Sequence, residues 1–149
     1  MSTILSACVV DANVVIKLFV HEDDSTLAKG FFAPFFTTPS QLVVYAPDLL
    51  YIECTNILWK YITRLGYDPI QAQQDLTDLN KMHIPTTPAH DLMNRALEIA
   101  CAHGTSAYDG CYVALAERMQ LPLLTADARL AGKFIGTSFQ IISLQSLTN

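Results

Sequence analysis

Two polar residues interrupt an otherwise apolar stretch near the start of the chain, CVVDANVVIKLF at residues 8–19. These residues are Asp11 and Asn13. Burying a carboxylate costs free energy unless a partner compensates its charge or water still reaches it. We therefore expect this stretch to end at the protein surface or to contribute to a functional site.

Three further acidic residues lie near the ends of predicted elements. Glu53 lies early in the helix that follows the second predicted strand, and Asp109 lies in the first turn of the helix before the fourth. Asp127 follows that fourth strand, as Asp11 follows the first. Function in open α/β sheets collects at the carboxyl ends of the strands. The topology can therefore bring all four acids together.

Carboxylates that approach one another closely repel, and they take up protons unless a cation neutralises them. Oxygen ligands without thiolate or imidazole favour Mg²⁺ or Mn²⁺. Such an ion activates a water molecule, and two ions can hold both the attacking and the leaving oxygen of a phosphodiester. The neutral residues Asn13 and Thr125 flank the acids and are suited to orienting a ligand or a water, although both could instead make local turn hydrogen bonds.

Each acid also has a purely structural interpretation. Asp11 and Asp127 could cap the helices that follow them, and Asp109 could complete a capping box begun by Ser106. Glu53 could lie exposed at the edge of the apolar face of its helix. A cap contributes only about 1 kcal/mol, which is a weak reason to keep a carboxylate in such apolar surroundings. The four acids taken together favour a site.

The composition indicates one globular domain over residues 1–149. Hydrophobic residues make up 51% of the chain, but no uncharged apolar run reaches the length of a membrane-spanning helix. No basic segment precedes the first apolar stretch, so we expect a cytoplasmic protein without a secretory signal or membrane contact. The net charge of −5 argues against a basic nucleic-acid coat, but it leaves nucleic acid open as a substrate.

The four cysteines form no C-x-x-C motif, and each lies in an apolar segment. We expect reduced cysteines in the core rather than disulfides or a zinc site. The four histidines are scattered singly, without an HExxH motif, which argues against a histidine metal site.

Apolar runs and turn signals divide the chain into alternating strands and helices. The strands are expected at 7–10, 42–46, 83–87, 121–125 and 139–144, the third of them on an edge. The helices are expected just after Asp11 and at 25–36, 48–65, 68–81, 88–103, 106–119 and 128–133. This alternation predicts an α/β fold with a mainly parallel sheet and helices on both faces.

Four stretches, in order along the chain, resemble the PIN domain family and, within it, the VapC-type toxins of toxin–antitoxin pairs. They are VVDANVVIKLF, APDLLYIECTNIL, SAYDGCYVALAERMQLPLLTADARL and IISL. The resemblance implies a three-layer fold with five strands in the order 3-2-1-4-5. It also implies a Mg²⁺-dependent ribonuclease, with Mn²⁺ as an alternative ion, that hydrolyses RNA through a metal-activated water.

The resemblance also assigns the site residues. The residues that match the family's acidic quartet, as metal ligands and catalytic groups, are Asp11, Glu53, Asp109 and Asp127. Asn13 matches the small polar residue after the first acid, and Thr125 the hydroxyl residue before the last.

Two partners besides RNA follow from the resemblance: a second copy of the chain, and a cognate antitoxin whose C-terminal segment crosses the acidic site. The helices at 48–65 and 68–81 are candidates for these contacts, or they could merely cover the sheet. In a dimer we expect Tyr51, Trp59 or Ile62 at the interface. Only 9 Lys and Arg residues are present, fewer than expected for such a nuclease, which suggests a small, structured RNA target.

Three alternative functions stay open. A haloacid-dehalogenase-like phosphohydrolase needs a second aspartate two residues after the first, where this chain has Asn13. A receiver-like phosphoacceptor needs an acidic doublet after the first strand, which is missing here. A PIN scaffold that binds a protein partner without catalysis would not need the complete set of four acids.

Overall fold

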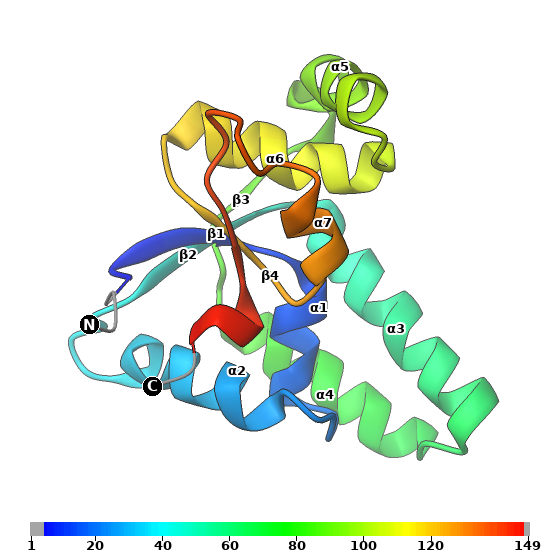
Figure 1. Cartoon of the computed structure of the whole chain (residues 1–149). Coiled ribbons are helices and arrows are strands. Elements are labelled where there is room, and N and C mark those ends of the chain that lie inside the picture. Colours follow the sequence, from blue (N-terminus) through cyan, green and yellow to red (C-terminus); the bar gives the residue numbers. More distant parts are fainter. Residues whose placement is uncertain (1–4, 148–149) are drawn as a thin grey trace.

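A single parallel sheet organises the computed structural model, which describes residues 5–147. Its strands are β1 (Ala7–Val10), β2 (Val43–Pro47), β3 (Thr86–Thr87), β4 (Leu123–Thr125) and β5 (Ile141–Ser143). They pair in the order β3-β2-β1-β4-β5, and every pairing is parallel (Figure 1). The α/β fold class and the strand order expected from the sequence are confirmed.

Helices cover the sheet on both sides. The α-helices are α1 (Ala12–Val15), α2 (Ser25–Phe32), α3 (Leu49–Leu65), α4 (Pro69–Lys81), α5 (Met93–His103), α6 (Ala107–Met119) and α7 (Ala128–Gly132). Short 3-10 turns are η1 (Ile16–Leu18), η2 (Ala33–Phe36), η3 (Ala89–Asp91) and η4 (Leu144–Leu147). In Figure 1, α5 and α6 lie on one side of the sheet, and α1, α2 and α4 lie on the other. The three layers follow from strands that are apolar on both faces.

Helix ends follow the local chemistry that the sequence indicates. Asp68 accepts a hydrogen bond from the backbone N–H of Ile70 at 3.0 Å, and Pro69 occupies the first helical position of α4. Gly66 ends α3 with φ of 68°, a conformation that costs glycine little.

Several element boundaries differ from the sequence expectation, and the strands expected at 121–125 and 139–144 are shorter, at Leu123–Thr125 and Ile141–Ser143. The helix expected at 25–36 changes to a 3-10 turn after Phe32, next to Pro34, which has no N–H to continue the helix. The helix expected at 88–103 begins with η3, where Asp48 accepts a hydrogen bond from the Ala89 N–H at 2.9 Å. The third strand has only two residues, because Pro85 cannot donate to the sheet. Its edge position is confirmed.

The core lies where α6 packs on the sheet. The side chains from Cys111 to Ala116 are all buried, as are Val9 and Val10 of β1. Helices α5 and α6 approach so closely that a side chain at Gly110 would collide with the carbonyl of Ala96. Helix α6 is therefore held firmly between the sheet and α5.

The cysteines are all free, but one is outside the core. Cys8, Cys54 and Cys111 are buried, as expected, whereas Cys101 is exposed on α5. The prediction of a core position is therefore wrong for Cys101. Among the described residues, no helix has the length and apolar character needed to cross a membrane.

Candidate active site

The carboxyl ends of the adjacent strands β1 and β4 bring the first and last parts of the site together. The backbone N–H of Asp11 donates to the carbonyl of Leu124 at 3.0 Å. The hydroxyl of Thr125 then donates to Asp11 Oδ2 at 2.9 Å. Two residues 114 positions apart in the sequence are thus joined at the edge where we expected the acids to meet.

Asp11 is buried, with 4% of its surface exposed, and it does not cap α1. Its side chain makes no capping hydrogen bond of normal geometry to that helix, although the backbone N–H of Asn13 lies close enough to lower its pKa. Burial raises the pKa of Asp11 from 3.8 to about 7. The neighbouring charges of Asp109 and Glu53 add to the rise, and the hydrogen bond from Thr125 opposes it. A carboxylate kept in such a place needs a compensating cation or a proton.

Asn13 and Thr125 hold the segment that follows β4. The Asn13 amide donates to Thr125 Oγ1 at 3.2 Å and accepts from the Ala126 N–H at 2.9 Å. The Asp127 N–H donates to Thr125 Oγ1 at 3.1 Å. Apart from this last bond, these are long-range contacts rather than the local turn bonds considered for both residues. They fix the backbone that leads to Asp127.

Glu53 reaches the same region from α3. It is half-buried rather than exposed, and its Oε1 atom is shielded from solvent without a hydrogen-bond partner in the described part of the chain. Burial raises the pKa of Glu53, the adjacent Tyr112 hydroxyl opposes the rise, and the charge of Asp109 adds to it. The alternative of a fully exposed Glu53 is therefore wrong.

Asp109 lies half-buried in the first turn of α6. Ser106 caps this helix by accepting a hydrogen bond from the Asp109 N–H at 3.0 Å. Burial raises the pKa of Asp109, a hydrogen bond from Ser106 lowers it, Asp127 raises it and Lys133 lowers it. The residue therefore takes part in the capping interaction and also lies in the electrostatic field of the other acids.

Asp127 is exposed and caps α7, as the structural interpretation allowed. Its Oδ1 atom accepts hydrogen bonds from the Arg129 N–H at 2.9 Å and from the Leu130 N–H at 3.2 Å. A capping carboxylate keeps a second oxygen free, so this geometry leaves a role toward a cation open.

The four carboxylates gather at one end of the sheet but do not yet surround a common point. The charges of Asp11, Glu53 and Asp109 affect one another, and Asp127 is coupled to Asp109. Within residues 5–147, no three His, Cys, Asp or Glu side chains are already arranged to hold a metal ion. The donor set consists of carboxylate oxygens, one of them buried and unpaired, which suits Mg²⁺ or Mn²⁺ after side-chain rotation.

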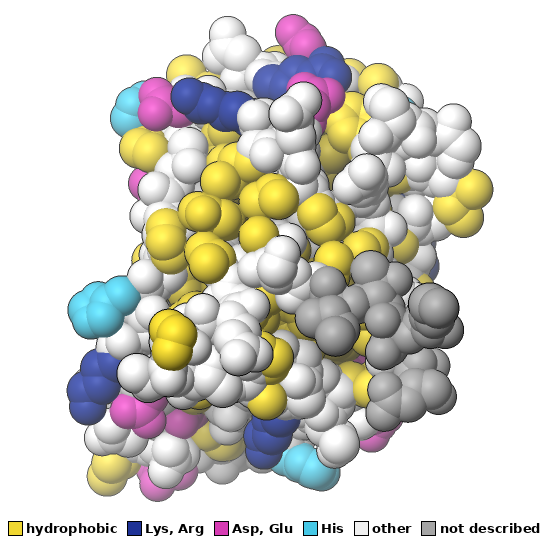
Figure 2. Space-filling view, turned by 90° about the vertical axis from the view of Figure 1, so that its left-hand side faces the viewer, with side chains coloured by type: hydrophobic (Ala, Val, Ile, Leu, Met, Phe, Trp, Pro, Cys, Tyr) yellow, Lys and Arg dark blue, Asp and Glu magenta, His cyan; other side chains and the backbone are white. Residues whose placement is uncertain are grey.

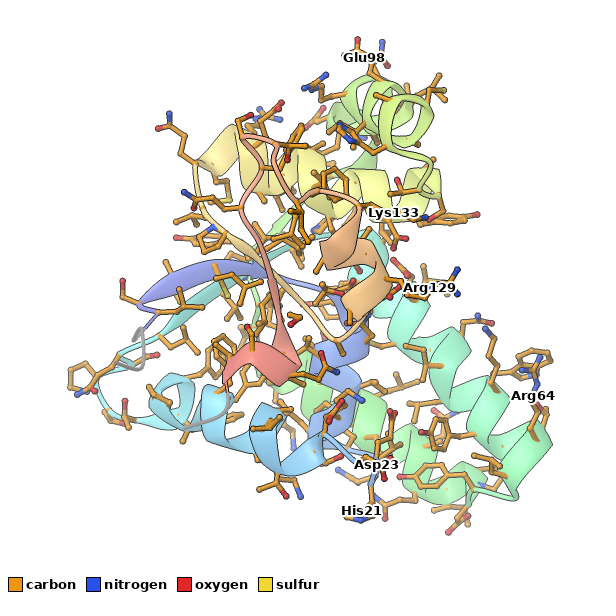
Figure 3. All side chains as sticks on the ribbon, in the orientation of Figure 1. His21, Asp23, Arg64, Glu98, Arg129 and Lys133 are labelled. Atoms are coloured by element: carbon orange, nitrogen blue, oxygen red, sulfur yellow. The ribbon has the colours of Figure 1, made fainter. Side chains whose placement is uncertain are left out.

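Sequence reasoning missed three residues near these acids. Tyr112 reads as one more apolar residue of α6, yet its hydroxyl lies next to Glu53. Arg129 lies on α7 and Lys133 directly follows that helix, and both side chains are exposed (Figure 3). Lys133 is near enough to Asp109 to lower the pKa of that carboxyl. Arg129 and Lys133 lie four residues apart, two and six positions after Asp127, and this spacing is a signal that could have placed them on one helical face.

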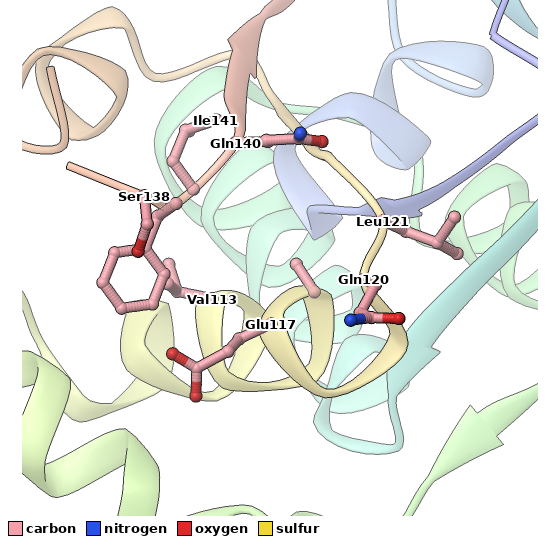
Figure 4. A pocket seen from close by; sticks show the side chains of 9 residues that line it. Val113, Glu117, Gln120, Leu121, Ser138, Gln140 and Ile141 are labelled. Carbon is pink, nitrogen blue, oxygen red and sulfur yellow. The ribbon is translucent and has the colours of Figure 1, made fainter. Parts of the chain in front are cut away.

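A separate hollow, with a volume of about 200 Å³, lies beside α6 at the other end of the sheet (Figure 4). Its lining includes Val113, Phe139 and one carboxylate, Glu117. That carboxylate is paired with Arg95 at 2.8 Å, so the hollow has no free acid for chemistry. The carboxyl end of the sheet is therefore the better candidate site.

Figure 2 shows a face with apolar side chains at its centre and charged groups mainly at its upper and lower margins.

Comparisons with known proteins identify the family. The family model described as "PIN domain" matches residues 8–133. Ribonuclease VapC3 of Pyrobaculum aerophilum is 31% identical over 128 residues, which cover 85% of this chain and 93% of that protein. The crystal structure of PAE2754 from Pyrobaculum aerophilum has a TM-score of 0.66 at 23% identity and covers 96% of this chain and 86% of its own.

A toxin–antitoxin complex from Klebsiella pneumoniae has a TM-score of 0.61 at 17% identity, with 92% of this chain and 97% of that chain covered. At this level of identity the two solved structures support the fold, whereas the family model and the VapC3 relative establish the family. The chain belongs to the PIN domain family, in its VapC-type branch.

Proposed function

We propose that this protein is a divalent-metal-dependent ribonuclease and the toxin of a toxin–antitoxin pair. The observation that carries the proposal is the buried Asp11 at the carboxyl end of β1, whose pKa is raised to about 7 beside Glu53 and Asp109. A fold keeps such unfavourable charge where a ligand compensates it. The 31% identical relative named Ribonuclease VapC3 supports RNA as the substrate.

The acids and the residues that position them have separate proposed roles. Asp11, Glu53, Asp109 and Asp127 would hold Mg²⁺ or Mn²⁺ through their carboxylate oxygens. A divalent cation in this position supplies charge neutralisation and lowers the pKa of water for attack on a phosphodiester. Thr125, held by hydrogen bonds to Asp11 and Asn13, keeps Asp11 in place and supports the backbone before Asp127.

The RNA contact is proposed to include Arg129 and Lys133, because both follow Asp127 closely and have exposed side chains. Lys133 is close enough to Asp109 to lower its pKa, and it donates to the Gly104 carbonyl at 2.7 Å. Arg129 begins α7 directly after Asp127. Two cations beside the acids would bind backbone phosphates without reading bases.

A direct test measures cleavage of a mixed RNA pool by the purified chain with Mg²⁺, with Mn²⁺ and with EDTA. We expect cleavage only with a divalent ion, and none from an Asp11→Asn variant that is folded as judged by its thermal melt. Release of phosphate from small phosphoesters by the same protein, without RNA cleavage, would instead support a phosphohydrolase. That alternative has little support, since Asn13 occupies the position of its second aspartate and positions Ala126 instead.

We further propose a cytoplasmic homodimer that a cognate antitoxin inhibits. The solved toxin–antitoxin complex of the same fold supports such a partner. On α3, Trp59 is 54% exposed and stays a candidate for the dimer contact. Tyr51 and Ile62 are partly buried against the core and are weaker candidates. Sedimentation that shows a monomer at high concentration, or a dimer that Trp59→Ser leaves intact, would contradict this interface.

A further inference from the structure

The acidic site contains a buried tyrosine without an evident role. Tyr112 lies on α6, one helical turn after Asp109, and its side chain is fully buried. Its hydroxyl has no hydrogen-bond partner in the described residues 5–147. A phenylalanine would fill the same space without leaving a polar group unpaired, and buried hydroxyls normally find a partner. The hydroxyl therefore calls for an explanation other than packing.

A carboxylate that acts on that hydroxyl also has an oxygen without a hydrogen-bond partner among the described residues. Tyr112 lies against Glu53, and the charges of Glu53 and Asp11 both act on it. The Oε1 atom of Glu53 is also buried and unpaired among the described residues. The hydroxyl lies close enough to Glu53 to lower the pKa of that carboxyl as a hydrogen bond does, but the two groups fall outside normal hydrogen-bond geometry. Because Glu53 is only half-buried, its side chain can rotate to form one.

We propose that Tyr112 is a positioning residue for Glu53, donating a hydrogen bond to one carboxylate oxygen and thereby presenting the other oxygen to a divalent cation. The inference rests on the proposed metal-dependent function. A hydrogen bond of this kind fixes the orientation of a ligating carboxylate, and its loss typically lowers metal affinity by about 10- to 100-fold. The buried location strengthens the bond, because it is charge-assisted and shielded from water.

The test is Tyr112→Phe in the full chain, freed of metal and titrated with Mn²⁺ alone by calorimetry. We expect the Mn²⁺ affinity to fall by about 10- to 100-fold. The melting temperature of the metal-free variant should stay the same or rise, because only an unpaired buried hydroxyl is removed. The Mn²⁺ concentration for half-maximal RNA cleavage should rise in parallel, with most of the rate recovered at saturation.

A matched control is available on α3. The hydroxyl of Tyr61 also lies against a glutamate, Glu22, but that glutamate pairs with Lys17 at 2.7 Å and is no part of the acidic site. Tyr61→Phe makes the same chemical change and should leave the Mn²⁺ affinity unaltered. An equal loss of affinity in both variants would contradict the inference.

A double-mutant cycle shows whether Tyr112 acts through Glu53. In a Glu53→Ala background, Tyr112→Phe should change the Mn²⁺ affinity less than about twofold, since the group it positions is absent. If the fold-losses in Mn²⁺ affinity of the two single variants multiply in the double variant, the proposal is wrong. An unchanged affinity in Tyr112→Phe itself would also overturn it.

Failure of the inference is distinguishable from failure of the proposed function. If the unaltered protein binds no Mn²⁺, or if Asp11→Ala binds it as well as the unaltered protein does, the metal-dependent function is wrong and the inference is wrong with it. If Asp11→Ala abolishes binding while Tyr112→Phe binds normally, only the role of Tyr112 is wrong.

Discussion

Acidic side chains occur in two regions of this molecule under opposite electrostatic conditions. On the surface formed by α5 and α6, Arg95 pairs with Glu98 at 2.9 Å and with Glu117 at 2.8 Å. The hydrogen bond from Arg95 lowers the pKa of Glu117. At the carboxyl ends of β1 and β4, burial raises the pKa of Asp11 and Glu53, and neither forms an ion pair with a Lys or Arg of residues 5–147.

The difference separates acids that serve stability from acids that are available to a ligand. Acids that only stabilise a surface are matched with a cation from the same chain and remain in water. Acids that are buried together without a cation reduce the stability of the isolated protein, which is common at sites that bind a ligand. The contrast can be tested by removing charge in each region.

The largest expected effect is on catalysis. Asp109→Asn keeps the shape of the side chain, and Ser106 still caps α6. RNA cleavage should fall by roughly a hundredfold or more, in line with the loss of one well-placed electrostatic group. The metal-free protein should melt at the same temperature or higher because repulsion is relieved, and the stabilisation by Mg²⁺ should shrink. Activity assays and thermal melts with and without Mg²⁺ measure all three. Retained cleavage with an unchanged Mg²⁺ shift would show that Asp109 only supports its helix.

A second effect appears as pH dependence of stability. The pKa of Asp11 is about 7 in the folded protein against an ordinary value of 3.8, so between these values the folded state binds more protons than the unfolded state. The metal-free protein should therefore lose stability as the pH rises through this window. Asp11→Asn cannot ionise, so its advantage in melting temperature should grow from about pH 4 to about pH 8 in EDTA. A constant difference between the two proteins would argue against a buried, ionising Asp11.

A smaller effect is expected on RNA binding. Replacing both Arg129 and Lys133 by Ala should raise the KM for RNA several-fold with little change in kcat, and it should reduce the salt dependence of binding. The control is Lys29→Ala with Lys81→Ala, which removes the same charge from α2 and from the end of α4. Equal behaviour of the two double variants would show that only net charge matters.

The smallest effect is expected on the surface formed by α5 and α6, where Arg95 pairs with the acids. Arg95→Ala removes a surface ion-pair network and a cation–π contact with Phe139, whose ring centre lies 5.9 Å from the guanidinium carbon. Exposed ion pairs are worth about 0.2–1 kcal/mol, so denaturant unfolding should show a loss of that order. RNA cleavage and its metal dependence should be unchanged. A loss of activity in a variant of normal stability would mean that the two regions are coupled.

Much of the fold could be predicted because its signals are local. Asp68 and Pro69 mark the start of α4, Gly66 marks the end of α3, and the apolar run before Asp11 marks β1. Two boundaries failed at prolines within the segment, Pro34 and Pro85, and a third depends on a contact from elsewhere in the chain. The start of the helix after Pro88 is altered by Asp48, which lies 41 residues from Ala89, the residue whose N–H donates to it.

In the candidate site, too, some features follow from the sequence and others follow only from the folded structure. The sequence by itself determined which residues could do chemistry. The type of each residue, and its position after a strand or in the first turns of a helix, can be read directly from the sequence. Only the tertiary structure decided how each one is used. It separates Asp11, which is buried and makes no capping hydrogen bond of normal geometry, from Asp127, which is exposed and caps α7, although both follow a strand in the sequence.

The tertiary structure also decided what surrounds the acids. It places the hydroxyl of Tyr112 beside Glu53, although the two residues lie on different helices and Tyr112 reads as part of an apolar pattern. Burial and the charges of distant residues arise only when strands and helices pack together, so a pattern along one chain segment cannot carry them. For that reason the sequence indicates the acids themselves, whereas their burial, their raised pKa values and their hydrogen-bond partners belong to the folded protein.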